Sequence, residues 1–403
     1  MPLLLVFLAV LSAGVVAYGT NAFWAQYPHG IELILWSRRL EWPLVTLSLL
    51  LCLVLLGLIV AGKRRAWWLI GLGPVLALFA HHYLADPAAS YFVVEGPTFV
   101  SAEQAPFLAD GDYVVGLRFG DAAYAYPYAV LFHDPVVIHS DHDKRLMLMW
   151  SAFANRAVAQ RITRDLKARD LEIVSTPANA LLLYDRGSGQ FINALKGQTM
   201  DGRKPIGFGP PVALSTMTWK DWHALNPQTQ VMRPTGRQFA SEPPHDPILP
   251  AYPMPPAILE RPATTRIVLV GTTQPAALPS DQIGPEPRHV IVDGEPAFVF
   301  RERPDKPVRA FSCHLKKEEV FTRFHLDSAH RYQGSMFIDS DTDSGWSAAG
   351  LWVDGLKEMR QEMKGTRLIP IPVQDGLYWG VMKLWYPDLK LAPTAETQVP
   401  SAS

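Results

Sequence analysis

The sequence predicts an α+β protein that is mostly β, in which N-terminal transmembrane helices precede a duplicated, strand-rich soluble domain. Three observations lead to this prediction. Long uncharged apolar segments are confined to the first 85 residues, short apolar segments typical of strands fill the remainder, and similar landmarks occur twice in the same order along that remainder. A chain of 403 residues has room for both a membrane anchor and a sizeable soluble core.

Three apolar segments predict three membrane-spanning helices. They cover residues 1–18, 44–61 and 66–80, and about 20 apolar residues cross the hydrocarbon core of a bilayer. The pair Trp67-Trp68 and Tyr83 flank the third segment, where aromatic side chains favour the membrane interface. Because no Lys or Arg precedes the first segment, we predict a retained helix, with a cleaved signal peptide as the alternative.

A basic triplet, Lys63-Arg64-Arg65, sets the predicted orientation. It lies in the short loop between the second and third segments, and short loops rich in Lys and Arg stay in the cytoplasm. No further Lys or Arg follows before Arg118. We therefore predict a multi-pass protein of the cytoplasmic (inner) membrane whose C-terminal domain is extracytoplasmic. Arg38 and Arg39 conflict with this orientation, unless an interfacial helix over residues 31–36 places them at lipid headgroups.

Composition limits the partners. The net charge is −1, with 37 basic and 38 acidic residues, whereas a nucleic-acid-binding face needs a positive excess. We expect the lipid bilayer as one partner, a membrane or envelope protein as a possible second, and no nucleic acid. No cofactor is required by the sequence. Cys52 lies inside the second span and Cys313 far along the soluble part, so they cannot form a disulfide.

The soluble part divides around a stretch rich in proline, which is typical of an extended linker. Landmarks on its two sides recur at separations of 155, 152 and 160 residues, namely Gly116 and Gly271, Pro127 and Pro279, and Pro227 and Pro387. The predicted organisation is a membrane anchor (1–85), a connector (86–111), a first strand-rich half (112–240), a Pro-rich linker (241–265), a second strand-rich half (266–391) and a disordered tail (392–403).

Local patterns predict the individual elements. Strands are expected in the first half at 113–119, 146–150, 171–174 and 180–184, and in the second half at 267–270, 290–292 and 297–300. Asp293-Gly294 is a signal for a two-residue hairpin turn. Helices are expected over 152–169, where Val158, Ile162 and Leu166 form an apolar stripe, and over 356–364.

These landmarks resemble the bacterial and archaeal family catalogued as domain of unknown function 3179, over about residues 112–391. The residues that carry the resemblance are Ala125-Tyr126-Pro127 with His133-Asp134, Leu182 to Arg186, Trp219-Lys220-Asp221-Trp222 with Asn226-Pro227, and Asp341 to Trp346. The resemblance implies a duplicated, often tethered or exported domain of undetermined activity. Members commonly carry a Cys-Pro-x-Cys-like element where this chain has Met149 to Phe153, without cysteine. If that element binds a metal or does redox chemistry in members, this chain has lost it.

The first candidate site joins two polar landmarks at strand ends. We expect His133 and Asp134 to approach Tyr184, Asp185 and Arg186, so that Asp185 would keep the imidazole protonated. The alternative is that Asp185 only caps the turn that follows it.

The loop from Asp339 to Gly345 is the second candidate, with Asp341, Asp343 and Trp346 as binding residues. It resembles a calcium loop, but its glycine falls at position 7 rather than 6 and position 12 is Gly350 instead of Glu. A turn capped by aspartate is the favoured alternative, and the repeated tryptophans are expected to be core anchors.

A metal site is the third candidate. His139, Asp141 and His142 could meet around one ion in a turn, whereas His133 and His139 would be roughly 20 Å apart in an extended chain. A solvated loop explains the same residues.

The sequence contains no recognised catalytic motif. Cys313-His314 could be a nucleophile and base, but neighbouring residues of a strand point to opposite faces, and we expect Cys313 to be buried. We therefore predict a membrane-anchored binding or assembly module. The alternative is a hydrolase-like or metal-dependent enzyme with a site around His133, Asp134 and Asp185.

Overall fold

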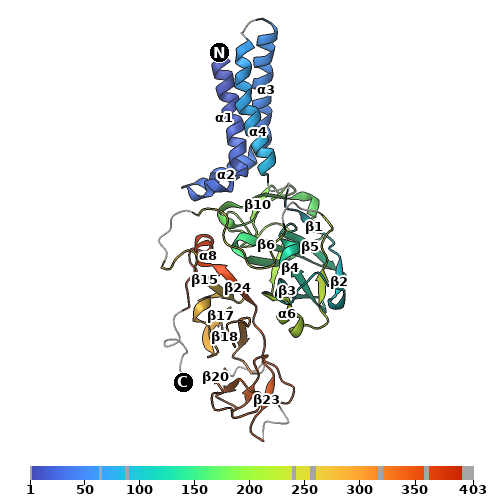
Figure 1. The fold of residues 1–403 in the computed structure, drawn as a ribbon, viewed down its shortest axis with the longest axis vertical. Coiled ribbons are helices and arrows are strands. Elements are labelled where there is room, and N and C mark those ends of the chain that lie inside the picture. The colour runs from blue at the N-terminus through green and yellow to red at the C-terminus, as the bar shows by residue number, and fades with distance from the viewer. Residues whose placement is uncertain are drawn as a thin grey trace.

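The computed structural model describes residues 2–62, 66–86, 90–237, 242–254, 260–315, 321–357 and 363–392. A bundle of helices occupies one end of the molecule and a strand-rich body the other (Figure 1). The predicted fold class is therefore confirmed. The triplet Lys63-Arg64-Arg65 and all but the first residue of the predicted tail lie outside the described residues.

Three helical segments form the bundle. They are α1 (Pro2–Thr20), α3 (Glu41–Val60) and the segment Ala66–Ala85, which comprises η2 (Ala66–Gly71) and α4 (Leu72–Ala85). Each is long and apolar enough to cross a membrane. The start of α1 and the end of α3 lie at the end of the bundle farthest from the body (Figure 1).

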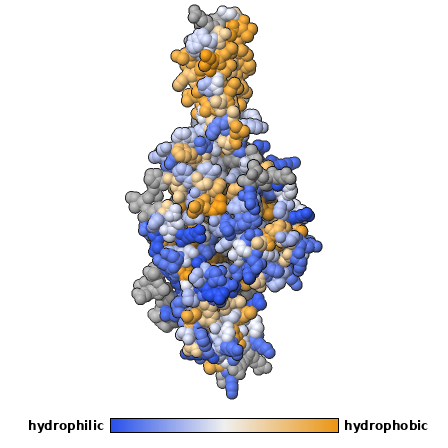
Figure 2. Space-filling model, in the orientation of Figure 1, coloured by the Kyte–Doolittle hydropathy of each residue, from blue (hydrophilic) through white to orange (hydrophobic). Residues whose placement is uncertain are grey.

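The surface of the bundle is apolar over most of its length, in contrast with the polar surface of the body (Figure 2). Exposed aromatic residues lie toward both of its ends. Trp42 and Tyr83, 77% and 81% exposed, are near the body, and Trp67, 55% exposed, is near the far end. Amphipathic aromatic rings at two levels are typical of the two interfaces of a bilayer.

The helix predicted over residues 31–36 is present as α2 (Gly30–Arg39), which follows η1 (Ala22–Gln26). Its apolar face does not lie free, because Ile34 and Ala25 of η1 are buried in a cluster with Trp379 of the second half. The bundle is thus packed onto the body rather than joined to it by a loose tether.

The first half consists of three stacked sheets. The first contains β3 (Tyr113–Phe119), β4 (Ala122–Pro127), β13 (Leu214–Thr218), β14 (Gln230–Met232) and β2 (Phe99–Ser101). The middle sheet has the order β1 (Val93–Glu95), β5 (Val136–Asp141), β6 (Lys144–Ser151), β7 (Arg156–Ile162) and β12 (Phe208–Val212). The third has the order β11 (Gln198–Thr199), β10 (Gln190–Asn193), β9 (Leu182–Asp185) and β8 (Leu171–Ser175).

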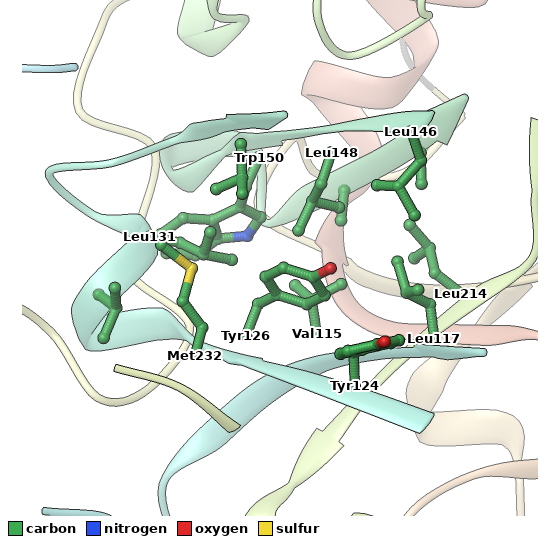
Figure 3. Packing of buried hydrophobic residues seen from close by; sticks show 14 of the residues in the cluster. Val115, Leu117, Tyr124, Tyr126, Leu131, Leu146, Leu148, Trp150, Leu214 and Met232 are labelled. Carbon is green, nitrogen blue, oxygen red and sulfur yellow. The ribbon is translucent and has the colours of Figure 1, made fainter. Parts of the chain in front are cut away.

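The middle sheet explains the continuous apolar run in β6. Leu146, Leu148 and Trp150 pack against the first sheet (Figure 3), while Met147 and Met149 pack against the third. All five are completely buried. A strand covered on both faces needs apolar side chains at every position, whereas a strand covered on one face alternates.

The helix predicted over residues 152–169 is wrong. This segment forms the 3₁₀ turn η5 (Ala152–Ala154), a left-handed Asn155 and then β7, which pairs antiparallel with β6. The stripe of Val158, Ile162 and Leu166 mimics a helical period, but β7 also buries the intervening Ala157 and Ala159. Pairing with the buried β6 therefore overrides the local pattern.

The second half also has three stacked layers. Next to the first half lie β16 (Ala276–Pro279), β15 (Arg266–Val270) and β24 (Val373–Tyr378). Then come β17 (Arg288–Val292), β18 (Glu295–Phe300) and β19 (Arg309–Ser312), and finally β20 (Phe324–Leu326), β21 (Phe337–Asp339), β22 (Gly345–Trp346) and β23 (Trp352–Asp354). Asp293 and Gly294 have φ of 52° and 89°, which confirms the predicted hairpin turn.

One eight-stranded sheet joins the two halves, with the order β16-β15-β24-β13-β3-β4-β14-β2. At its centre β13 and β24 are parallel and pair at Thr216 and Gln374, and the hydroxyl of Ser215 accepts a hydrogen bond from the amide of Val373 at 3.1 Å. Each of these two strands leads directly into a short helix, α6 (Trp219–Leu225) and α8 (Trp379–Trp385) respectively.

Segments outside the predicted halves are bound to the body. Strands β1 and β2, which fall in the predicted connector, pair with β5 and β14. Residues 242–254 of the Pro-rich stretch form no helix or strand, and Tyr252 exchanges two 2.8 Å hydrogen bonds with the amide group of Asn179. Residues 358–362, the centre of the helix predicted over 356–364, lie outside the described residues.

Candidate functional site

A single helical turn positions the His133-Asp134 landmark. The turn, α5 (Tyr128–Leu131), begins after Pro127, and the amide of Asp134 donates to the carbonyl of Val130 at 3.2 Å. Proline is well suited to such a start because its φ is already close to helical. Both landmark residues are buried, His133 being 7% and Asp134 2% exposed. The Nδ1 atom of His133 faces the carbonyl of Ser90 at 3.3 Å.

Both carboxylate oxygens of Asp134 have partners. One lies 2.8 Å from Nη1 of Arg237, and the other accepts from the hydroxyl of Thr235 at 3.1 Å. Burial raises the pKa of Asp134, and these two partners oppose the increase. The guanidinium of Arg237 also lies 3.9 Å from the ring centroid of Phe92. Asp134 therefore clamps the segment after β14 onto the start of β5, which is a structural task.

A pocket of about 450 Å³ is lined by Asp134, Thr235 and Arg237. Its polar lining includes His133, Asp134, Arg237, Glu242 and His245. The last three were missed in the sequence, where they are scattered around a proline-rich stretch without any pattern. A mixture of imidazoles and charges of both signs in one concave site suits binding of a polar ligand.

The second landmark lies elsewhere. Asp185 ends β9 and caps its own turn, because its carboxylate accepts from the amide of Gly187 at 2.9 Å and the hydroxyl of Ser188 at 2.5 Å. This is the alternative weighed for Asp185. Tyr184 stacks obliquely on Phe191, with ring centroids 4.8 Å apart. None of residues 184–186 lines the His133 pocket, so the structure gives the two landmarks separate surroundings.

Arg186 belongs instead to a set of charges where the bundle meets the body, which we call the anchor junction and define as Arg38, Glu41, His82, Asp86, Glu172 and Arg186. Glu172 of β8 accepts from Arg186 at 2.7 Å and from Arg38 at 3.2 Å. Arg38 also lies 3.1 Å from Glu41 and 3.7 Å from Asp86. The side chain of Arg38 is 2% exposed, so carboxylates rather than lipid headgroups neutralise it.

The aspartate loop after β21 is organised around Asp339. Its completely buried carboxylate accepts from the backbone amide and hydroxyl of Thr342, both at 2.7 Å, and from the indole of Trp346 at 2.9 Å. Asp341 is exposed, and Asp343 pairs with Arg331 at 2.6 Å. The loop is thus an aspartate-capped turn, and Trp346 is a completely buried core residue.

The predicted metal ligands do not converge. The Nδ1 atom of the buried His139 lies 2.8 Å from the hydroxyl of Tyr126, and burial lowers the pKa of His139 to about 4. His142 is in the turn after β5, where its exposed ring contacts Asp141 at 2.7 Å. Among the residues that the structure describes, no group of three or more His, Cys, Asp or Glu side chains is placed to hold a metal ion.

Cys313 and His314 do not form a nucleophile and base. Cys313 is buried in the phenylalanine-rich core of the second half, and burial raises the pKa of its thiol to about 12. The ring of His314 faces Glu295 at 3.0 Å. A thiol with so high a pKa carries almost no thiolate near neutral pH.

Comparison with known proteins gives a family and no activity. The family described as "Protein of unknown function (DUF3179)" matches residues 93–388, which cover both halves and the stretch between them. No curated protein and no solved structure matches the chain. The function has to be argued from the geometry of the chain itself.

Proposed function

Given that the chain belongs to the DUF3179 family, whose function is unknown, we propose that it is a membrane-anchored binding module. In this proposal the three apolar helices lie in the cytoplasmic membrane, the strand-rich body is extracytoplasmic, and the pocket at His133 and Asp134 receives a polar ligand or a segment of a membrane or envelope protein. Nucleic acid is not among the proposed partners.

The observation that carries the proposal is the packing of the bundle onto the body. Arg38 and Glu172 link α2 to β8, and Ile34 is buried against the second half. The body is thereby held at one end of an apolar bundle, while the end of α3 lies at the other end of that bundle (Figure 1). In the sequence, Lys63-Arg64-Arg65 follows α3 closely. Cytoplasmic retention of that basic triplet puts the body on the opposite side of the membrane.

The hydrogen bonds of Asp134 favour a binding role over a catalytic one. A general base needs a carboxylate that can reach a substrate proton, whereas both oxygens of Asp134 are held by Arg237 and Thr235. The hydrolase-like alternative needed His133, Asp134 and Asp185 in one site, and Asp185 caps a turn beside the bundle.

We further propose that the two halves arose by duplication. Each stacks three layers, whose strands are mostly antiparallel, in the same chain order. Asp185 and Asp339 both end a strand of the outermost layer and cap the following hairpin turn. Trp219 and Trp379 both begin the helix that follows the strand shared at the centre. Correspondence at three levels supports a common origin for the halves.

Cysteine labelling tests the orientation with the chain's own thiols as a low background, since Cys313 is buried and Cys52 lies within α3. Ala61→Cys places a thiol at the exposed far end of α3, and Lys220→Cys places one on the exposed surface of the body. A membrane-impermeant maleimide added to spheroplasts should label the Lys220→Cys variant. It should label the Ala61→Cys variant only after the membranes are opened.

The unsubstituted chain is the control and should remain unlabelled under both conditions. The reverse labelling pattern would show that the body is cytoplasmic and would reject the proposal.

A further inference from the structure

A second cavity, of about 260 Å³, lies where the two halves meet. Its walls come from β7 and β12 of the first half, from the turn after β10, and from residues 271–275, β24 and Tyr386 of the second half. It shares no residue with the His133 pocket.

Two cationic side chains, Arg156 and Lys196, line this cavity, and no aspartate or glutamate is among its lining residues in the part of the chain that the structure describes. Arg156 is 6% exposed. Its Nε and Nη1 atoms have no hydrogen-bond partner among the described residues. The hydroxyl of Tyr386 is a hydrogen-bond partner of the Arg156 side chain, and it also donates to the carbonyl of Leu195 at 2.9 Å.

A buried guanidinium with unused N–H groups is costly, because it gives up hydration without a replacement. Buried charges in proteins are normally paired. The side chain of Arg156 lines a cavity that is large enough for several non-hydrogen atoms. This arrangement indicates a ligand that supplies acceptor oxygens and negative charge.

Lys196 is held at the same cavity by its backbone. The turn after β10 places it there, since the amides of Lys196 and Gly197 both donate to the carbonyl of Asn193, at 3.2 and 2.8 Å. Gly197 has φ of +64°, and its carbonyl accepts from the amide group of Gln160 at 3.0 Å. The ammonium group lies 5.2 Å from the ring centroid of Tyr386.

Two aspartates near the cavity, Asp388 and Asp293, have other interactions. Asp388 attracts the ammonium of Lys196 and so opposes the effect of burial, which lowers the pKa of Lys196. The carboxylate of Asp293 is occupied by the backbone amides of Thr272, Thr273 and Gln274, at 2.6–2.9 Å. Neither of these aspartates lines the cavity.

We propose that this cavity binds a small oxyanion, with Arg156 as its main donor and Lys196 as a second cation. Guanidinium groups match carboxylate and phosphate oxygens in geometry as well as in charge. Gln160 also lines the cavity, and its Oε1 atom has no hydrogen-bond partner among the described residues. A ligand that carries a hydroxyl besides its negative charge, such as hydrogen phosphate or a hydroxycarboxylate, satisfies both groups.

The proposal goes beyond the membrane-anchored binding module, because it concerns a different cavity and does not depend on the orientation in the membrane. The test uses the full chain purified in detergent and isothermal titration calorimetry with two probes, inorganic phosphate and malate. Saturable binding of at least one probe, at one site per chain, is the expected result.

Substitutions then locate the site. Arg156→Met should weaken binding at least about tenfold, and Lys196→Gln by a smaller factor. Arg161→Met is the matched control, because Arg161 lies on the same strand but is exposed and does not line the cavity. It should bind as the unsubstituted chain does.

Thermal unfolding separates a binding role from a structural one. Without ligand, Arg156→Met should have an unchanged or higher Tm, since it removes a buried, incompletely paired charge. The bound probe should raise the Tm of the unsubstituted chain and not that of the variant. If Arg156→Met does not fold, Lys196→Gln, which is only partly buried, decides the question.

Two outcomes would overturn the proposal. The first is that neither probe shows saturable binding below about 10 mM. The second is that the folded variants bind the probe as tightly as the unsubstituted chain, which would place the anion elsewhere.

Discussion

Arg38 of α2 and Glu172 of β8 form an ion pair at 3.2 Å across the boundary between the apolar bundle and the strand-rich body. Glu172 at the same time accepts from Arg186 at 2.7 Å. One carboxylate therefore connects a helix beside the apolar bundle to the outermost sheet of the first half. The pair also resolves the conflict that Arg38 raised in the sequence, since its charge is compensated within the protein.

Removal of Arg38 is expected to destabilise the protein. Arg38→Met leaves Glu172 and Glu41 with less compensation in a largely buried site, and breaking such a set costs about 3 kcal/mol. Urea unfolding in detergent measures the free energy of unfolding. Arg39→Met is the control, because Arg39 is exposed, and an equal loss in both variants would contradict the role assigned to the anchor junction.

Asp339 is expected to matter for stability and Asp341 not to. Asp339→Ala removes the acceptor for the amide and hydroxyl of Thr342 and for the indole of Trp346, at a cost of about 2–3 kcal/mol. Asp341→Ala changes an exposed side chain and should stay within about 0.5 kcal/mol of the unsubstituted chain. Differential scanning calorimetry measures both variants.

The same loop should be insensitive to calcium. The oxygens of Asp339 already accept hydrogen bonds within the turn, so Ca²⁺ is expected to leave the Tm unchanged. A rise in Tm that saturates with Ca²⁺ and disappears in Asp341→Ala would instead support a cation site.

Stability should fall on mild acidification because of His139. Burial lowers its pKa from 6.5 to about 4, against a weaker opposing effect of Asp141. Above pH 6.5 the ring is neutral in both states. As the pH falls from 6.5 to about 4, the unfolded chain takes up a proton that the folded chain does not, which removes about 3 kcal/mol from the free energy of unfolding.

His139→Gln should reduce this decline between about pH 7 and pH 4.5. His289 also has a pKa lowered to about 4 by burial, so part of the decline should remain in the variant. Denaturant titrations at several pH values measure the difference. The same slope in the variant and the unsubstituted chain would show that His139 does not titrate abnormally.

Cys313 should be unreactive in the folded protein. Its thiol is buried among aromatic side chains and has a pKa raised to about 12. Iodoacetamide at neutral pH, followed by peptide mass spectrometry, should modify Cys313 only after unfolding. Modification of the native chain at a rate near that of a free thiol would mean that the core opens readily.

The sequence predicted a strand-rich body and the hairpin turn at Asp293-Gly294 because alternation and turn residues are local signals. It did not predict how the sheets stack in layers. It failed over residues 152–169, where β7 pairs with a strand that is buried on both faces. Gly116 and Gly271, which occupy similar places in the two halves of the sequence, also show that a sequence landmark does not define its structural role. A side chain at Gly116 would collide with the ring of Trp222, whereas Gly271 has φ of +103° and lies against Val292, so similar landmarks serve different local needs.

The candidate sites were harder to predict. His133 and Asp134 do line a pocket, but its other charged residues, Arg237, Glu242 and His245, come from a segment without periodicity. Arg156 falls within the helix predicted over residues 152–169, and it is instead a buried residue of β7. Side chains that are brought together by pairing of strands distant in the sequence have no regular spacing along the chain, so a sequence pattern does not reveal them.

The parallel contact between β13 and β24 has a consequence for shorter versions of this chain. A polypeptide that ended after β14 would expose the backbone amides and carbonyls along one side of β13, and an open sheet edge recruits another strand. The first half alone should therefore form homodimers through this edge, with a second copy in the place of β24. Expression of residues 90–237 alone, followed by size-exclusion chromatography with light scattering, would reveal such a species. In the intact chain, covalent linkage makes that association intramolecular and independent of protein concentration.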